Sequence, residues 1–329
     1  MTHPVLEVLH TRLRDDSAPG ARSDPHRVAV VLEGGGMRGV VSGGMVTALE
    51  QLGLRGVFDL VVGSSAGALA GAYFLAGQAA LGTSIYYEDL IGRHWINRRG
   101  VLRGRPLLRL EYLLDEVMAH RKPLDWDALL ASGVALRPVV TRLPDYQPAL
   151  LGTGGTREEL CHALRASARI PLVAGDPDVV DRVEYIDGSF SEAIPIRTAQ
   201  TLGATRFVVL LTRPEGCRRR DPGRLDRRAL APAMDWKLPG LGATYLRRAE
   251  RYDRELALLE DCCRDTEAGP TALAIRPPAH APEIRQLEQG RTALRTGAEI
   301  GEEAVLRALA PIPRRSPTAP RVPVTAGGR

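Results

Sequence analysis

Asp59-Leu60-Val61-Val62-Gly63-Ser64-Ser65-Ala66-Gly67-Ala68-Leu69 is the stretch that decides the fold of this chain. Its first four residues are largely apolar and predict a buried strand, and the small residues after Ser65 predict a closely packed helix. Ser65 then lies at a sharp turn, which small neighbours permit because they let the strand and the helix approach each other. The turn holds the Ser65 hydroxyl outside the sheet, at the positive end of the helix. We interpret this turn as a nucleophile elbow, made of Gly63, Ser64, Ser65, Ala66 and Gly67.

A glycine-rich loop precedes the elbow. The β-branched run 27–32 leads directly into Glu33-Gly34-Gly35-Gly36-Met37-Arg38-Gly39, and a helical pattern continues through residues 40–52. Because a helix connects the two strands, this order predicts that they are parallel neighbours in one sheet.

The same loop matches the dinucleotide fingerprint G-x-G-x-x-G at Gly34, Gly36 and Gly39. A dinucleotide site also needs an acidic residue at the end of the second strand, whereas Asp59, the only acid there, lies near the start of that strand. We therefore predict that the loop presents backbone N–H groups to an oxyanion, with support from the dipole of the following helix.

A base must activate the Ser65 hydroxyl, because a hydroxyl is a poor nucleophile until its proton is removed. Asp187 ends a predicted strand and is followed by the turn-permissive Gly188, and such sheets bind ligands at the carboxyl ends of parallel strands. The downstream histidines lie neither beside a glycine nor at a predicted strand end: they are His94, His120, His162 and His280. Asp187 is therefore the preferred base.

Taken in this order, the glycine loop 33–39, the elbow 63–67 and the pair Asp187-Gly188 resemble the patatin-like phospholipase family, including its bacterial members. The segment 163–171 resembles the run that precedes the catalytic Asp in that family. The resemblance covers about residues 27–212. It implies an α/β fold: a patatin-like three-layer α/β/α sandwich with a mostly parallel central sheet, followed here by a C-terminal helical extension.

The resemblance also implies a Ser-Asp dyad that hydrolyses lipid acyl esters through an acyl-enzyme, with no cofactor and no metal. Ser65 is the nucleophile and Asp187 the base in this scheme. The implied oxyanion hole consists of the glycine-loop residues Gly34, Gly35, Gly36, Met37, Arg38 and Gly39. Two residues depart from the family's pattern without removing a catalytic atom: Glu33 stands where Asp or a small residue is frequent, and Ser189 follows Gly188 where Ala or Gly is usual.

An aspartate with an ordinary pKa of about 3.9 is a weak base toward a hydroxyl. The dyad therefore predicts that Asp187 is buried beside Ser65, where desolvation raises its pKa. Two other functions stay open from the sequence. One is an α/β-hydrolase with a triad of Ser65, Asp187 and His280, and the other is a non-enzymatic nucleotide-binding or membrane-associated module.

The composition is that of an ordinary globular protein: 329 residues, of which 44% are hydrophobic and 25% charged, with a net charge of +5. The four cysteines show no zinc-ligand spacing, and the first residues lack the pattern of a secretory signal. We therefore expect a cytoplasmic protein. Residues 60–82 carry no charge, but they contain polar residues and begin as a strand, so we expect no membrane span there.

The expected organisation is a loosely held N-terminal arm (1–25), a catalytic domain (26–213), a mainly helical region (214–310) and a disordered tail (311–329). Long helices are expected within the third part, over 241–261 and 283–309. The arginine-rich loop 98–109 favours a solvated surface, with peripheral contact to an anionic membrane as the alternative. We expect a lipid or ester substrate and no nucleic-acid partner, and the oligomeric state stays open.

Overall fold

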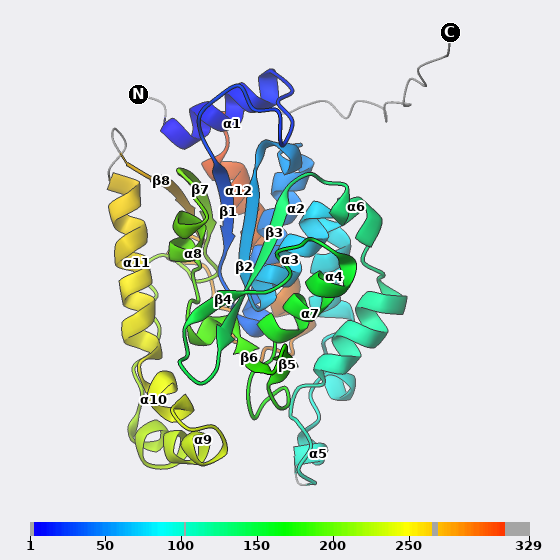
Figure 1. Cartoon of the computed structure of the whole chain (residues 1–329), viewed down its shortest axis with the longest axis vertical. Helices are drawn as coiled ribbons and strands as arrows, with labels where there is room; N and C mark the ends of the chain where they lie inside the picture. The colour runs from blue at the N-terminus through cyan, green and yellow to red at the C-terminus, as the bar shows by residue number, and fades with distance from the viewer. Residues whose placement is uncertain (1–2, 102, 265–268, 313–329) are drawn as a thin grey trace.

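Runs of branched apolar residues form the middle strands of the sheet in this computed structural model, which describes residues 3–101, 103–264 and 269–312 (Figure 1). These strands are β1 (Val28–Leu32), β2 (Leu60–Ser64) and β7 (Arg206–Leu210). In β1, Val28, Val30 and Leu32 face one hydrophobic core, and Ala29 and Val31 face the other. Because both faces of the sheet are covered, neither set of alternating residues can be polar.

The described ranges contribute eight strands to one sheet, and most of them are parallel. From edge to edge the order is β5 (Asp178–Val180), β6 (Val183–Asp187), β3 (Ala135–Arg142), β2, β1, β7 and β8 (Thr271–Ile275), with β4 (Pro148–Leu150) paired to β3 off this path. The adjacent strands β3, β2, β1, β7 and β8 run parallel to one another. Strands β4 and β6 run antiparallel to β3. The expected mostly parallel sheet is confirmed.

Helices cover both faces of this sheet, which gives the expected α/β/α sandwich (Figure 1). One face carries α2 (Gly39–Gln51), α3 (Ala66–Leu75), α4 (Ala79–Glu88), the π-helical segment Tyr112–Arg121, α6 (Trp126–Leu130), α7 (Arg157–Ser167) and α12 (Arg291–Ala308). The opposite face carries α8 (Ile196–Thr201) and α11 (Arg248–Arg264). The short helices α5 (Arg98–Val101), α9 (Ala231–Lys237) and α10 (Leu241–Leu246) lie at one end of the molecule.

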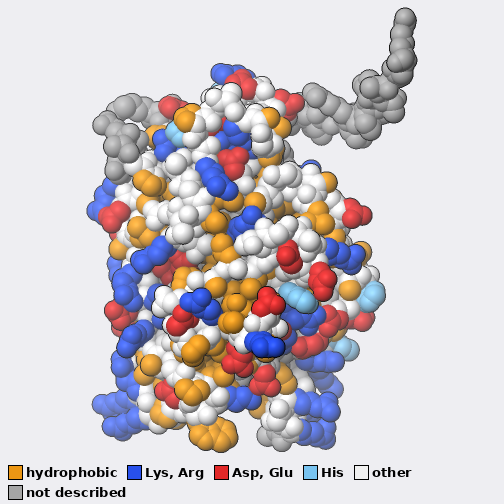
Figure 2. Space-filling model, viewed as in Figure 1, with side chains coloured by type: hydrophobic (Ala, Val, Ile, Leu, Met, Phe, Trp, Pro, Cys, Tyr) orange, Lys and Arg blue, Asp and Glu red, His pale blue; other side chains and the backbone are white. Residues whose placement is uncertain are grey.

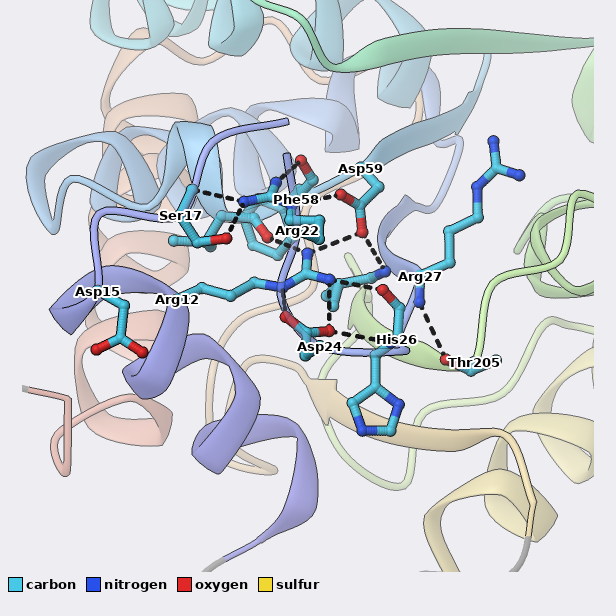
Figure 3. A network of polar contacts seen from close by, with 12 residues as sticks. Arg12, Asp15, Ser17, Arg22, Asp24, His26, Arg27, Phe58, Asp59 and Thr205 are labelled. Carbon is cyan, nitrogen blue, oxygen red and sulfur yellow. Dashed lines mark hydrogen bonds and ion pairs between the residues drawn. The ribbon is translucent and has the colours of Figure 1, made fainter. Parts of the chain in front are cut away.

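The N-terminal segment is packed against the sandwich, so the expectation of a loosely held arm is wrong for its described residues. Helix α1 (Pro4–Arg14) buries Val5, Leu6, Leu9 and Leu13 in the core. Arg12, only 1% exposed, forms ion pairs of 2.8 Å with both Asp24 and Asp59. Asp59 also accepts a hydrogen bond from Arg22 at 2.7 Å (Figure 3). Asp59, near the start of β2, therefore holds the N-terminal segment in place through its ion pairs with Arg12 and Arg22.

The segment after residue 213 also belongs to the sandwich, in addition to forming helices. Its strand β8 pairs in parallel with β7, and α12 packs along α2. That helix contact depends on glycine, because a Cβ at Gly44 would lie only 2.0 Å from the carbonyl oxygen of Ala298. The two long helices expected here are shorter than predicted. The first is divided into α10 and α11 at Arg247, and the second begins only at Arg291, after a loop that contacts the glycine loop.

No helix of the described ranges is long and apolar enough to cross a membrane. The uncharged stretch 60–82 is divided among β2, α3 and the start of α4. Residues 313–329, most of the expected disordered tail, lie outside the described residues.

Candidate active site

The elbow has the geometry that its small residues predict. β2 ends at Ser64 and α3 begins at Ala66, so Ser65 alone makes the turn, with φ 54° and ψ −124°. This left-handed value of φ is strained for a residue with a side chain. The turn also needs glycine beside it, because a Cβ at Gly67 would lie 2.5 Å from the carbonyl oxygen of Leu32. The small residues of the elbow therefore lie where the strand and the helix approach each other most closely.

Ser65 and Asp187 are in direct contact. The Ser65 hydroxyl donates a hydrogen bond of 2.5 Å to Oδ2 of Asp187. The expectation that Asp187 ends a parallel strand is wrong, because β6 runs antiparallel to β3. The register still brings the two side chains together: Ser64 pairs with Val139 of β3, and the next residue, Val140, pairs with Asp187. The strand β6 therefore ends beside the elbow, with only β3 lying between β6 and β2.

Asp187 is completely buried. Burial raises the pKa of its carboxyl group, while hydrogen bonds from Ser189 and Ser65 oppose that rise. Ser189 makes two of these bonds to Oδ1, from its backbone N–H at 2.8 Å and from its hydroxyl at 2.6 Å. The departure from the family's pattern at residue 189 thus adds a donor to the very carboxylate that faces Ser65.

Ser167 supports the elbow and was not singled out from the sequence. Its hydroxyl accepts a hydrogen bond from the Ser65 N–H at 2.9 Å and donates one to the carbonyl oxygen of Val139 at 2.7 Å. Ser167 is fully buried at the end of α7. The available signal was its place in segment 163–171, which resembles the family's run before the catalytic Asp. Ser167 thus holds the backbone of the turn at Ser65.

The glycine loop leaves only some of its N–H groups available to a ligand. Four of them donate to backbone carbonyls: Gly34 to Ala193, Met37 to Gln286, Arg38 to Gly35, and Gly39 to Gly36. The N–H groups of Gly35 and Gly36 have no acceptor within the described residues. The same holds for Ala66, at the start of α3. Of the six loop residues expected in the oxyanion hole, Gly35 and Gly36 are the two whose donors face no protein acceptor.

Glu33 and Arg38 hold the loop in place. Both are buried, and Arg38 donates from Nε to the hydroxyl of Thr212 at 2.9 Å. Glu33 accepts the backbone N–H of Thr212 at 2.6 Å and lies 3.8 Å from the Arg38 guanidinium. Burial lowers the pKa of Arg38, and the charge of Glu33 opposes that change. The glutamate at position 33 therefore ties the glycine loop to the end of β7.

A cavity of about 380 Å³ contains both Ser65 and Asp187 in its lining. Its walls are largely apolar and include Trp95, Leu108, Ile170, Phe190, Met234 and Leu287. A second apolar cavity of about 50 Å³ shares Ser65 with the first and extends to Leu90 and Leu113. The larger volume lies within the range of small-molecule sites, roughly 300–1,000 Å³.

None of the other candidate bases lines this cavity. His280 is exposed in the loop after β8, and neither it nor His94, His120 or His162 lines the cavity. Across residues 3–101, 103–264 and 269–312, His, Cys, Asp and Glu side chains form no group of three that resembles a metal site.

Comparison of the sequence with known proteins identifies its family. A model of the patatin-like phospholipase family matches residues 30–199. The uncharacterized protein YjjU of Escherichia coli (strain K12) is 31% identical over 193 residues, which cover 58% of this chain and 53% of that protein. This chain therefore spans about half the length of that relative.

Among solved structures, VipD from Legionella pneumophila is similar over 88% of this chain and 67% of its own, with 12% identity and a TM-score of 0.43. The family model covers more than half of the 329 residues and includes the glycine loop, the elbow and Asp187. The chain belongs to the patatin-like phospholipase family.

Proposed function

We propose that this protein hydrolyses acyl esters of lipids, with Ser65 as the nucleophile and Asp187 as the base. One observation carries the proposal: the Ser65 hydroxyl donates directly to a buried carboxylate, inside a cavity with apolar walls. The chain's family is one of lipid acyl hydrolases, and this supports the reaction class.

In the acylation step, Oγ of Ser65 attacks the ester carbonyl carbon while Oδ2 of Asp187 takes the hydroxyl proton. The carbonyl oxygen becomes an oxyanion, and the free N–H groups of Gly35 and Gly36 stabilise it. The tetrahedral intermediate then collapses. Its bond to the leaving alcohol breaks, and the alcohol takes the proton from Asp187, which leaves an ester between Ser65 and the acyl group.

Deacylation reverses these roles with water. Asp187 takes a proton from water, the resulting hydroxide attacks the acyl carbon, and Ser65 recovers its proton from Asp187 as the fatty acid leaves. The raised pKa of Asp187 suits both steps, because a stronger base removes a proton more readily from a hydroxyl or from water.

The apolar cavities suit the acyl chain. The smaller one is lined by Ser65, Leu90 and Leu113, so a chain esterified to Ser65 can extend into it along apolar walls. In this arrangement the rest of the lipid occupies the larger cavity.

Peripheral contact with an anionic membrane is the second part of the proposal. Trp236 of α9 is 88% exposed, and Leu225, which precedes the π-helical segment Asp226–Leu230 that leads into α9, is 78% exposed. The same segment exposes Arg224, Arg227 and Arg228. Basic side chains also gather at both lower corners of the view in Figure 2, with hydrophobic side chains at its lower edge. Aromatic and aliphatic groups beside arginines are the composition of an interfacial surface.

Ester hydrolysis by matched variants tests the catalytic proposal. A panel of soluble and lipid esters is assayed with the wild type, Ser65→Ala, Asp187→Asn and His280→Ala. We expect loss of hydrolysis in the first two variants and full activity in His280→Ala. A loss in His280→Ala as large as in Ser65→Ala would instead establish a Ser-Asp-His triad. Activity retained by Ser65→Ala would exclude Ser65 as the nucleophile.

Vesicle sedimentation tests the membrane contact. Trp236→Ala should bind vesicles that contain phosphatidylglycerol several-fold more weakly than the wild type. Leu130→Ala, which changes an exposed apolar residue of α6, is the matched control and should bind as the wild type does. Equal binding by all three proteins contradicts this surface as the contact.

A further inference from the structure

Arginines line one wall of the cavity that contains Ser65. Arg213 and Arg219 come from the segment after β7, and Arg248 and Arg251 come from the first turns of α11. The segment after β7 and the start of α11 thus contribute positive charge to the same cavity.

Two of these four arginines have side-chain partners among the described residues. Arg213 pairs with Glu283 and lies over the ring of Tyr252. Arg248 lies 3.5 Å from Asp226 and stacks on Tyr245. The side chains of Arg219 and Arg251, in contrast, have no hydrogen-bond or ion-pair partner among the described residues, although both are partly buried.

Several of the charges that act on Arg219 have its own sign. Burial and the charges of Arg248, Arg213 and Arg38 together lower the pKa of Arg219 to about 10, while Glu255 opposes this change. Arg219 also acts on Asp187 and lowers the pKa of that carboxyl group. A partly buried cation surrounded by cations is unfavourable, and proteins retain such an arrangement where an anion is to be bound.

The neighbours of Arg219 in the sequence show that its position is not a consequence of arginine-rich composition. Arg218 and Arg220 are both exposed, and Arg218 lies 3.4 Å from Asp253. Only the middle arginine of the three lines the cavity.

We propose that Arg219 binds an anionic group of the substrate and thereby makes the enzyme selective for anionic over neutral acyl esters. This inference rests on the proposed function. A guanidinium binds phosphate or carboxylate oxygens in a bidentate manner, so the group is a phosphate or a carboxylate attached to the leaving alcohol. The acyl chain then points toward Leu113 and the anion toward α11.

Three substrates with the same acyl chain test this selectivity: a monoacylglycerol, a monoacylglycerol phosphate and an acylated hydroxy acid with a free carboxylate. The ratio of kcat/KM for each anionic ester to that for the neutral ester is measured below the critical micelle concentration. In Arg219→Gln this ratio should fall by about 10- to 100-fold, mainly through KM, for the anion that the site binds. Arg219→Lys should retain part of the ratio, because it keeps the charge.

Arg218→Gln and Arg220→Gln are the matched controls, and both should keep the wild-type ratio. A fall for only the phosphate ester or only the carboxylate ester identifies the anion. An unchanged ratio in Arg219→Gln, or an equal fall in the two controls, overturns the proposal.

Failure of the proposed function would be visible separately, as a wild type that hydrolyses none of the three esters. Calorimetric titration with inorganic phosphate then decides the inference. Binding by the wild type that Arg219→Gln loses supports an anion site, and equal or absent binding in both rejects it.

Discussion

Gly36→Ala is the change whose consequence follows most directly from the shape of the glycine loop. Gly36 has φ +57°, a left-handed conformation that costs a residue with a Cβ about 1–2 kcal/mol. A Cβ there would also lie 2.9 Å from the carbonyl oxygen of Gln286, which accepts the Met37 N–H at 3.0 Å. Either the loop or the Gln286 segment must move, and both hold the Gly36 N–H in its place near Ser65.

We expect kcat of Gly36→Ala to fall by about 10²–10³-fold, the usual effect of losing one oxyanion-hole donor. Initial rates with a soluble short-chain ester measure kcat, and denaturant unfolding measures stability. Gly53→Ala is the matched control, because Gly53 also has a left-handed φ of +73° but no atom within 4 Å of an added Cβ. It should lose stability and keep kcat. A wild-type kcat in Gly36→Ala would refute the assignment of this loop as the oxyanion hole.

The remaining predictions concern the base, the N-terminal helix and the acyl cavity. Ser189→Ala removes a hydrogen bond that lowers the pKa of Asp187. That pKa should rise, and the acidic limb of the pH profile of kcat/KM should move to higher pH. An acidic limb that stays in place contradicts this role of Ser189. Arg12→Gln removes a buried cation, which leaves the partly buried Asp24 without its ion pair and Asp59 with Arg22 alone, and should destabilise the fold by about 3 kcal/mol in denaturant unfolding, whereas Arg14→Gln at the exposed end of α1 should change little. Leu113→Trp fills the smaller cavity and should reduce kcat/KM for long-chain esters about tenfold more than for butyryl esters. An equal reduction for both esters contradicts the placement of the acyl chain in this cavity.

Local sequence patterns were sufficient to predict the first two parallel strands and the elbow, whereas the three-layer sandwich was implied by the family resemblance. The apolar runs of β1 and β2 are too short for helices and have no polar face, so they indicate strands covered on both sides. Small residues around Ser65 indicate the turn because larger ones would clash, as the 2.5 Å approach at Gly67 demonstrates. These signals act over a few residues, which is why they can be recognised in a single sequence.

Features that depend on distant residues were not predictable in this way. The direction of β6 follows from how the chain returns to β3, and no residue of β6 itself specifies it. The packing of α1 depends on Asp59 meeting Arg12 across 47 residues of chain. Residues 283–290 have a helical pattern, yet they form a loop, one of whose carbonyl groups accepts the Met37 N–H.

The residues of the candidate site also differ in whether the local sequence predicts them. Ser65, Asp187 and the glycine loop could be proposed from motifs, because each occupies a recognisable local context. Ser167 had only the family resemblance of segment 163–171 as a signal, and its hydrogen bond to the Ser65 N–H could not be read from that resemblance. Arg219 could not be proposed, since one arginine among three carries no local signal. The available N–H groups of Gly35 and Gly36 also appear only when the acceptors of the other loop donors are known.

Covalent labelling by a fluorophosphonate tests the central claim, a nucleophilic Ser65 activated by Asp187, most directly. The folded protein is treated with the probe, and the adduct is located by peptide mass spectrometry. We predict one adduct, on Ser65, which is absent in Ser65→Ala, strongly slowed in Asp187→Asn and unchanged in His280→Ala. An adduct on another residue, labelling of Ser65→Ala at the wild-type rate, or no labelling of the folded wild type would contradict the claim.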